Sequence, residues 1–316
     1  MHRGYTIPLS LEKIDSQEID PASILSYFPN GLIIFDLETT GLSAFTDRII
    51  EIGAIKIDSK GKLNSFHTLI NPEIPIGEKT IKIHGISDHM VYSSPKMRQV
   101  LPKFLQFLEN LPIMAHNAKY DVGFLFMALM RNQFETPPVE VYDSCKLAKL
   151  AYPSLPHHSL TFLTKHLKID LHNKHRAYAD AYATAKMLQL GFTKITLEAK
   201  LYRVKEDALI YSLDKLRRND FQDMPSHIYP IIPKIANQEI IEIKYLGGHH
   251  RGVFRPIKVM GLIPVPYGYS LMALCLMSKT NKSFLVNKIT DFRFLPMAQQ
   301  QLLNSQIAQS PLDLSC

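Results

Sequence analysis

The chain has 316 residues, 46% of them hydrophobic and 21% charged, a composition that supports buried cores and excludes a disordered or low-complexity protein. At roughly 100–200 residues per domain, this length predicts about two domains. The formal net charge is +7, and +6 of it lies in residues 193–316, which carry 16 Lys and Arg against 10 Asp and Glu. Such a basic region favours a polyanion as partner, although solvated lysine faces are also common.

Neither a membrane protein nor a secreted one is expected. The longest apolar run, residues 269–277, is far shorter than the roughly 20 residues that a spanning helix needs. The start of the chain, residues 1–15, lacks the apolar region of a signal peptide. The three cysteines are widely separated and form no CxxC pair, which indicates reduced thiols. We therefore expect a cytoplasmic protein without a membrane partner.

Residues 31–192 have the pattern of an α/β domain. Apolar or alternating runs predict strands at residues 32–35, 49–57, 66–70, 112–115 and 139–142. Helical spacing of apolar residues predicts helices around residues 100–108, 122–130, up to about 150, 160–167 and 177–190. Three strands in a meander are thus followed by alternating strands and helices.

The rest of the chain has a different pattern. Residues 193–235 combine helical apolar spacing with many charges and three prolines, which predicts a helical linker and a connector. Residues 236–298 predict a small all-β domain, with strands at 240–245, 252–260, 269–277 and 283–289. Residues 1–30 are expected to form an N-terminal extension, and residues 299–316 a flexible tail.

The strongest chemical signal is the sequence DLETTG, residues 36–41, at the end of the first predicted strand. Side chains alternate along a strand, so Asp36 and Glu38 share one face with their Cα atoms about 7 Å apart. Two carboxylates that repel one another are tolerated where they bind a hard divalent cation such as Mg²⁺ or Mn²⁺. The simpler alternative is a pair of acids at the solvent end of a strand.

Two further segments carry acids and histidines. In HNAKYD, residues 116–121, Asp121 falls in the first turn of a predicted helix, where an acid also complements the helix dipole. HRAYAD, residues 175–180, leads into the last predicted helix. Five helical positions turn by roughly 140°, so His175 and Asp180 can serve one centre only if His175 lies on the preceding loop. Taken alone, this motif favours the simpler interpretation of His175 as an ordinary exposed histidine.

In their order and context, the three segments resemble the DEDDh exonucleases, a DnaQ-like family that includes the polymerase III epsilon subunit. Further similarities are IHGI at residues 83–86, Asp143 after the fifth predicted strand, and Ser159 before the penultimate helix. Tyr120 stands where the family usually has Phe. The resemblance covers residues 31–192. It implies an RNase H-like mixed sheet flanked by helices, joined by a linking helix to the small all-β domain, which we expect to be an SH3/Sm-like barrel.

The resemblance also implies a two-metal mechanism with Mg²⁺ or Mn²⁺. Two ions about 3.5–4 Å apart activate water and stabilise negative charge on the phosphoryl and leaving oxygens. Asp36 would bridge the ions, Glu38 and Asp180 would hold the one that carries the nucleophilic water, and Asp121 would support the other. His175 would be the general base, because an unperturbed pKa of about 6.5 leaves it able to accept a proton near neutral pH.

Substrate contacts are implied by the same resemblance. Backbone amides of Thr39 and Thr40 would bind the terminal 3′ hydroxyl, and Asn117 would contact a phosphate. Leu42 would wedge against the last bases, or it is a simple core residue. His84 would approach a nucleotide, or it is a turn histidine.

The predicted C-terminal β domain resembles a WYL domain, a barrel-like module of nucleic-acid proteins and regulators. The similarity lies in IKY at residues 243–245 and in Arg255 with its following proline. The namesake Trp-Tyr-Leu is not intact, since the chain has no tryptophan, and Lys288 replaces a frequent arginine. The resemblance makes Tyr245, Arg251, Arg255 and Lys288 candidate contacts for an anion or a single nucleic-acid strand.

We therefore expect a metal-dependent 3′-5′ exonuclease that acts on nucleic acid with a 3′ end, single-stranded DNA above all, and releases nucleoside 5′-monophosphates. A 3′-5′ exoribonuclease is the nearest alternative, because reading the 2′ hydroxyl depends on pocket shape. A non-catalytic nucleic-acid-binding or sensor protein on the same scaffold is a third, although all five predicted catalytic positions are filled. A polymerase or repair protein is a candidate partner.

Overall fold

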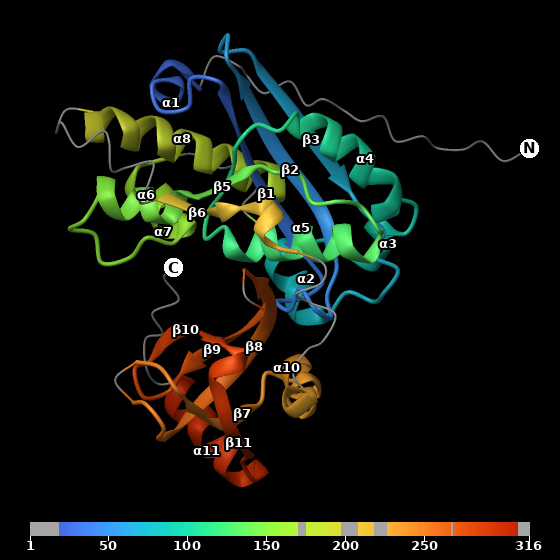
Figure 1. Cartoon of the computed structure of the whole chain (residues 1–316), viewed down its shortest axis with the longest axis vertical. Coiled ribbons are helices and arrows are strands. Elements are labelled where there is room, and N and C mark those ends of the chain that lie inside the picture. The colour runs from blue at the N-terminus through green and yellow to red at the C-terminus, as the bar shows by residue number, and fades with distance from the viewer. Residues whose placement is uncertain are drawn as a thin grey trace, which may run out of the picture. The chain divides into compact units, whose positions relative to one another are not determined.

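The structure, a computed structural model, describes residues 19–169, 175–196, 208–217, 226–248, 250–266 and 268–308 (Figure 1). Contacts divide the chain into two compact units. The first comprises Met1–Thr40, Ile49–Asp121 and Pro137–Ser212, and the second comprises Gly41–Arg48, Val122–Thr136 and Leu213–Cys316. Each unit contains one sheet, so the two units are described in turn.

The first unit contains a mixed six-stranded sheet in the order β3-β2-β1-β4-β5-β6. Strand β1 pairs antiparallel with β2 and parallel with β4, and the outer strands β3 and β6 are antiparallel to their neighbours. The strands are β1 (Gly31–Thr39), β2 (Ile49–Asp58), β3 (Leu63–Leu69), β4 (Ile113–Ala115), β5 (Glu140–Asp143) and β6 (Leu209–Ser212). This sheet confirms the predicted RNase H-like α/β fold class.

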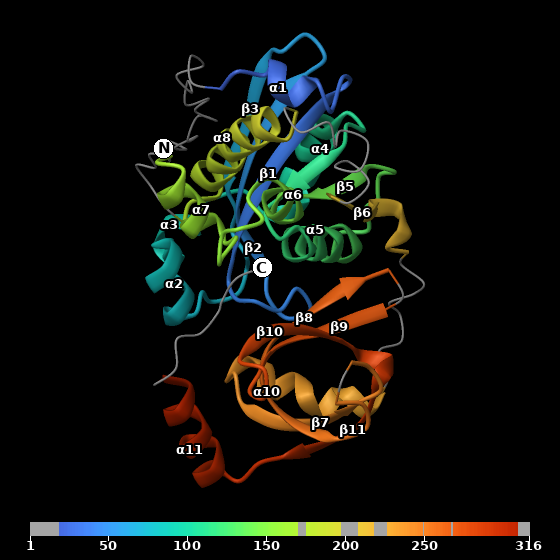
Figure 2. The same cartoon turned by 90° about the vertical axis from the view of Figure 1, so that its left-hand side faces the viewer.

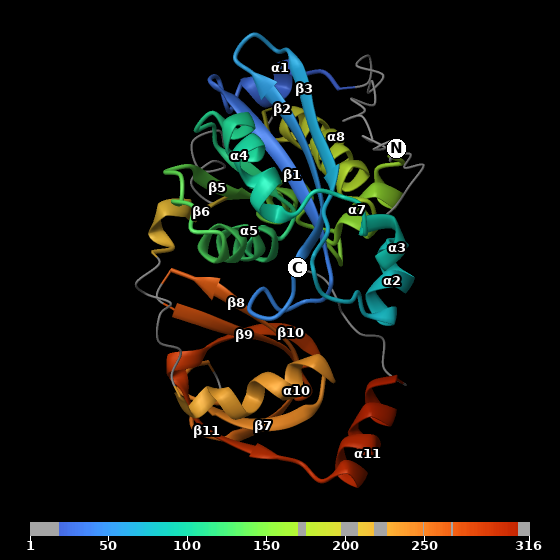
Figure 3. The same ribbon diagram turned by 90° about the vertical axis from the view of Figure 1, so that its right-hand side faces the viewer.

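Helices flank this sheet. They are α1 (Ala22–Leu25), α2 (Glu78–His84), α3 (Asp88–Val91), α4 (Met97–Leu108), α6 (Ser144–Ala151), α7 (Leu160–His166) and α8 (Ala177–Thr196). Helix α5 (Lys119–Arg131) begins in this unit, and its residues from Val122 on belong to the second unit. The sequence analysis predicted α4, α5, α6, α7 and α8 and missed the short helices α1, α2 and α3. Figures 2 and 3, taken from opposite sides, show α8 and α4 on opposite faces of the sheet.

The side chains of β1 point alternately to the two faces of the sheet, which explains why helices pack on both faces. Leu32 and Ile34 join a buried cluster with Leu188 of α8, whereas Phe35 packs its ring against Phe104 of α4 at 6.3 Å between centroids. Both faces of β1 are therefore covered, which is why its sequence is apolar without interruption up to Asp36. Asp36 and Glu38 continue the row of Leu32 and Ile34, so they share the α8 face.

The second unit contains an antiparallel five-stranded sheet in the order β10-β9-β8-β7-β11. Its strands are β7 (Ile240–Tyr245), β8 (Phe254–Val265), β9 (Gly268–Cys275), β10 (Thr280–Leu285) and β11 (Ile289–Phe294). The accompanying helices are the 3-10 helices η1 (Leu213–Lys215), η3 (Ser226–Ile231) and η4 (Val286–Lys288), with α10 (Ile232–Ala236) and α11 (Met297–Ala308). Four of the five strands were predicted.

The second unit also holds two segments from the first half of the chain. The backbone of Leu262 in β8 donates to the Ser43 hydroxyl at 3.3 Å, and its carbonyl oxygen accepts from the Phe45 N–H at 3.3 Å. The Arg131 guanidinium donates to the carbonyl oxygens of Ala44 and Phe45. Residues 41–48 are thus fixed by backbone-directed hydrogen bonds within this unit.

Two sequence predictions differ from the structure. Residues 209–212, expected within a helical linker, form the edge strand β6, because pairing with β5 outweighs the local helical spacing. Residues 299–308, expected in a flexible tail, belong to helix α11. Residues 1–18 of the predicted N-terminal extension, linker residues 197–207 and 218–225, and tail residues 309–316 lie outside the described part of the chain.

Among the described residues, the structure has no helix long and apolar enough to cross a membrane.

Candidate active site

Three acidic side chains meet at the end of β1. Asp36 and Glu38 project from the α8 face of β1, and Asp180 lies in the first turn of α8. One carboxylate oxygen from each lies within 4.8 Å of the other two. The packing of α8 on β1 therefore brings residues 36 and 180 together from opposite ends of the domain, and oxygen-rich clusters of this kind suit Mg²⁺ or Mn²⁺.

Asp121 is the fourth predicted acid, in the first turn of α5. The residue is 8% exposed, and its carboxylate accepts a hydrogen bond at 3.1 Å from the backbone N–H of Leu37, the residue between Asp36 and Glu38. Helix α5 thus presents its acid directly beside the DLETTG segment. Asp121 also raises the pKa of Asp36 through their like charges.

Burial together with the charges of neighbouring acids makes these four carboxyl groups hard to ionise. Burial, and then the charges of Asp121 and Asp180, raise the pKa of Asp36 well above its usual value. Burial, and then the charge of Asp180, raise the pKa of Glu38 to about 8. Burial likewise raises the pKa of Asp121 to about 7 and that of Asp180 to about 6. A bound cation would remove this repulsion, so the cluster has the electrostatic character of a metal site.

His175 lies just before α8, as the sequence analysis required for it to serve the same centre as Asp180. Its backbone is in the left-handed region, with φ 58°, and its side chain is exposed. The Asp180 carboxylate accepts a hydrogen bond from the His175 backbone, and the His175 charge lowers the pKa of Asp180. The His175 imidazole is thus exposed and close enough to Asp180 to influence its carboxyl group.

Another acid, Asp143, fixes the segment before α5 through hydrogen bonds. Asn117, also left-handed with φ 60°, donates its backbone N–H to Asp143 at 3.0 Å, and the same oxygen of Asp143 accepts from the Cys145 N–H at 2.9 Å as the cap of α6. His116 contacts the Ser144 hydroxyl at 2.9 Å. Asp143, noted in the sequence only as a family feature, therefore holds the loop that carries Asn117.

The other predicted substrate contacts have distinct environments. Thr39 ends β1, and the carbonyl oxygen of Thr40 accepts from the Thr80 hydroxyl at 3.2 Å. The side chain of Leu42 is 38% exposed, so it is not a core residue. His84, the last residue of α2, is buried, and burial lowers its pKa.

The sequence analysis missed Glu51, a buried acid near the start of β2. It is the register partner of Glu38 and has 0% exposure. The sequence offers only a weak signal, a single acid within the predicted strand at residues 49–57, which also contains Lys56.

The four candidate contacts in the second unit divide into two groups. Arg251 and Lys288 are exposed and Tyr245 is partly exposed, as a binding surface requires. Arg255 is 3% exposed and donates to the carbonyl oxygens of Gly247 and His250, so it also anchors that loop. Its guanidinium lies 5.9 Å from the centre of the Tyr245 ring.

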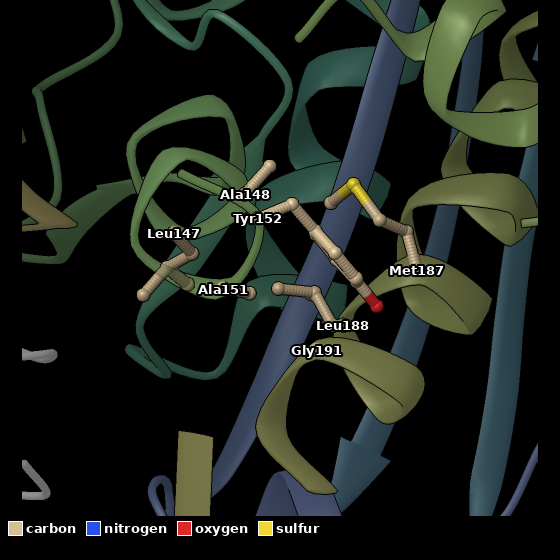
Figure 4. A pocket seen from close by; sticks show the side chains of 7 residues that line it. All are labelled: Leu147, Ala148, Ala151, Tyr152, Met187, Leu188 and Gly191. Carbon is tan, nitrogen blue, oxygen red and sulfur yellow. The ribbon is translucent and has the colours of Figure 1, made fainter. Parts of the chain in front are cut away.

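A small pocket lies between α6 and α8, lined by Leu147, Ala148, Ala151, Tyr152, Met187, Leu188 and Gly191 (Figure 4). Apart from the Tyr152 hydroxyl, these side chains offer no hydrogen-bonding group. The pocket lies within the apolar packing of the helices and shares no residue with the acidic cluster.

Residues 33–188 match the family model described as Exonuclease, RNase_T. The curated protein "DNA polymerase III PolC-type" of Clostridium perfringens is 38% identical over 207 residues, which are 66% of this chain and 14% of that protein. Its counterpart in Caldanaerobacter subterraneus subsp. tengcongensis is 36% identical over 202 residues, with 64% and 14% covered. This chain therefore spans about one seventh of the length of the curated relatives it matches.

A solved structure of exonuclease I, whose description says that it suggests how processivity is achieved, has a TM-score of 0.50 at 16% identity. The likeness covers 87% of this chain and 67% of that one, and at this identity it shows a shared fold. Together with the match over residues 33–188, the acidic cluster defines the class: this domain is an exonuclease domain of the DEDDh type, homologous to the PolC and DnaQ-like exonucleases.

Proposed function

We propose that the protein is a metal-dependent 3′-5′ exonuclease that removes nucleoside 5′-monophosphates from the 3′ end of a nucleic-acid strand. The observation that carries this proposal is the approach of Asp36, Glu38 and Asp180 to within 4.8 Å of one another in a domain of the exonuclease family. Asp121 and His175, the remaining residues of the DEDDh set, flank the same segments.

The residues present fit a divalent cation. The cluster offers only oxygen ligands, and the pKa values of Glu38 and Asp180 are raised first of all by burial, which nearby positive groups do not offset. Asp36, Glu38, Asp121 and Asp180 would hold two Mg²⁺ or Mn²⁺ ions. When bound, the ions supply Lewis acidity toward the phosphoryl oxygens and lower the pKa of a bound water.

The protein's own side chains position the strand and move the proton. His175 accepts a proton from the attacking water as general base, and its exposed position allows that proton to pass to solvent. Backbone amides at Thr39 and Thr40 bind the terminal 3′ hydroxyl, Asn117 contacts a phosphate, and His84 approaches the terminal nucleotide. Leu42 stacks as a wedge against the last bases, which its exposed side chain supports.

Single-stranded DNA is the substrate we favour. The specific support is the name of the curated relatives, "DNA polymerase III PolC-type", which also makes a polymerase the preferred candidate partner. The basic second unit would bind the strand away from the cleavage point, with Arg251 and Lys288 as exposed candidate contacts.

Digestion of end-labelled single-stranded DNA, duplex DNA and RNA of equal length, with Mg²⁺ or Mn²⁺, tests this proposal. We expect stepwise shortening from the 3′ end, fastest on single-stranded DNA, and no shortening in EDTA. Asp36→Ala should abolish hydrolysis with an unchanged or higher melting temperature, because it removes a repelling carboxylate. Glu109→Ala, at an exposed helix end, is the control. Equal turnover by Asp36→Ala and wild type would refute the metal-site assignment.

A further inference from the structure

Glu51 is a fifth buried carboxylate beside the acidic cluster. It faces Glu38 across the β1–β2 pairing, and its β2 neighbour Gly53 faces Asp36 in the same register. Side chains at facing positions of paired strands lie on one side of the sheet. Glu51 therefore lies on the α8 face, in the same layer as the proposed metal ligands.

Unlike those ligands, Glu51 has its oxygens fully occupied. The Arg176 guanidinium donates from Nε at 3.1 Å and from Nη2 at 2.6 Å. His67 Nε2 lies 2.7 Å from Oε1, and the backbone N–H of Ala177 donates to Oε2 at 3.0 Å. These contacts overcome the cost of burial and lower the pKa of Glu51 to about 2. Because both oxygens of Glu51 already accept hydrogen bonds, this carboxylate stabilises the local structure and is not free to bind a cation.

The groups that Glu51 binds belong to the start of α8. Ala177 is the first residue of that helix, and its N–H is one of the donors that a helix leaves unpaired at its N-terminus. Arg176 precedes it, and His175 precedes Arg176 in its left-handed conformation. Glu51 thus joins the start of β2 to the residue next to His175 and to the turn that carries Asp180.

A second contact shows how closely this turn lies against β2. A Cβ placed on Gly53 would come within 2.1 Å of the Tyr178 backbone nitrogen and 2.3 Å of the Ala177 carbonyl carbon. Only glycine admits the helix backbone at this depth. The position of α8 along β2 is therefore set by backbone packing on Gly53 and by the hydrogen bonds to Glu51.

We propose that Glu51 is a positioning residue of the active site: by holding Arg176 and the Ala177 N–H, it sets the positions of His175 and Asp180 relative to Asp36 and Glu38. The proposal rests on the function proposed above. It assigns to Glu51 no contact with the metal ions or the substrate. Its effect on the reaction passes through Arg176 and the first turn of α8.

The sharpest test removes the negative charge of Glu51 and the positive charge of Arg176 in separate variants and compares their affinities for metal. If Glu51 acted only through its charge, Glu51→Gln would weaken metal binding, whereas Arg176→Gln would strengthen it. If Glu51 positions α8 through Arg176, both substitutions weaken it. We expect each to lower the affinity for Mn²⁺, measured by calorimetry without substrate, by roughly 10–100-fold, as for other groups that orient metal ligands.

The double variant Glu51→Gln/Arg176→Gln completes the cycle. Because both residues act through one contact, we expect the double variant to lose no more Mn²⁺ affinity than the worse single variant. Opposite effects of the two single substitutions, or additive losses in the double variant, would overturn the proposal. Glu109→Gln, which removes an exposed carboxylate paired with Lys56, is the matched control and should bind Mn²⁺ as the wild type does.

Folding and the proposed activity are checked separately. Thermal melts show whether Glu51→Gln folds. If it does not, Arg176→Gln alone tests the proposal, since the Arg176 side chain is 30% exposed and the proposal requires its loss to lower the Mn²⁺ affinity. Wild-type affinity in a folded Arg176→Gln protein would overturn the proposal. If the wild type bound Mn²⁺ but digested no strand, the function proposed above would fail while the positioning of the metal ligands was still measured.

Discussion

The raised pKa values of the clustered acids predict a pH dependence of metal binding. Protons compete with the cation wherever the carboxyl groups are protonated, and the pKa values are about 6 for Asp180, 7 for Asp121 and 8 for Glu38. Affinity for Mn²⁺ should therefore rise as the pH increases from about 6 to 8, with protons released on binding. Calorimetry in buffers of different ionisation enthalpy counts these protons. An affinity for Mn²⁺ that did not change with pH would contradict the raised pKa values of these acids.

The same shifts have a consequence for the stability of the metal-free protein. A carboxyl group whose pKa is higher in the folded than in the unfolded chain contributes stability that is present below about pH 4 and is lost as the pH rises through its folded value. In EDTA, this contribution to the melting temperature should fall between pH 5 and 9. Asp36→Asn should make this decrease in melting temperature smaller, and Mn²⁺ added in place of EDTA should abolish it.

His175 is predicted to act as a base and not as a ligand. His175→Ala should lower the maximal rate by roughly 10²–10⁴-fold, the usual cost of losing a general base, while Mn²⁺ affinity stays near the wild-type value. His89→Ala, at another exposed histidine on a short helix, should leave both quantities unchanged. A large loss of Mn²⁺ affinity in His175→Ala would place the imidazole among the ligands.

At the scale of elements, the sequence predicted what depends on local pattern. The alternation in β1 correctly placed Asp36 and Glu38 on one face. Helix geometry required His175 to lie on the loop before α8 if it was to serve the same centre as Asp180, and the structure has it there. Glu51 was not recognisable, because its role depends on Arg176 arriving from a distance of 125 residues along the chain. Strand β6 was missed for the same reason, since pairing with β5 decides its conformation.

Gly53 tests the packing of α8 on β2. Gly53→Ala should force the start of α8 away from the sheet, because its Cβ would meet backbone atoms that cannot rotate aside. We expect a loss of about 1–3 kcal/mol in unfolding free energy, typical of overpacking, measured by urea denaturation.

Gly191→Ala, further along α8, provides the contrast. There a Cβ would make ordinary contacts at 3.5 Å with Ala151, and alanine stabilises a helix interior by about 1 kcal/mol relative to glycine. This variant should be as stable as the wild type or more stable. Equal destabilisation by the two substitutions would show that the Gly53 contact does not limit the approach of α8.

At the scale of the molecule, the chain cannot be truncated just after residues 33–188, the region that matches the exonuclease family, without removing parts of both sheets. Removing residues after 192 would delete β6, an edge strand of the catalytic sheet. It would also delete Leu262, which pairs with Ser43 and Phe45 just after the DLETTG segment. Loss of activity after such a truncation would therefore reflect damage to the fold, and the basic C-terminal region has to be tested in the full chain.

Charge neutralisation provides that test. Residues 193–316 carry +6 of the net charge of +7, and Arg251 and Lys288 are exposed within them. If both contact phosphates, Arg251→Gln/Lys288→Gln should make the log–log salt dependence of binding to long single strands shallower by roughly 0.7 for each lost contact.

Two comparisons make this last experiment decisive. Lys60→Gln/Lys103→Gln removes the same charge from exposed positions of the first unit and should leave the salt slope near the wild-type value, because neither lysine is a proposed contact. Cleavage of an oligonucleotide of three or four nucleotides should also be unchanged in Arg251→Gln/Lys288→Gln, since these residues are assigned no role at the metal site. An unchanged slope on long strands in the folded double variant would assign the basic region to a ligand other than the strand being digested.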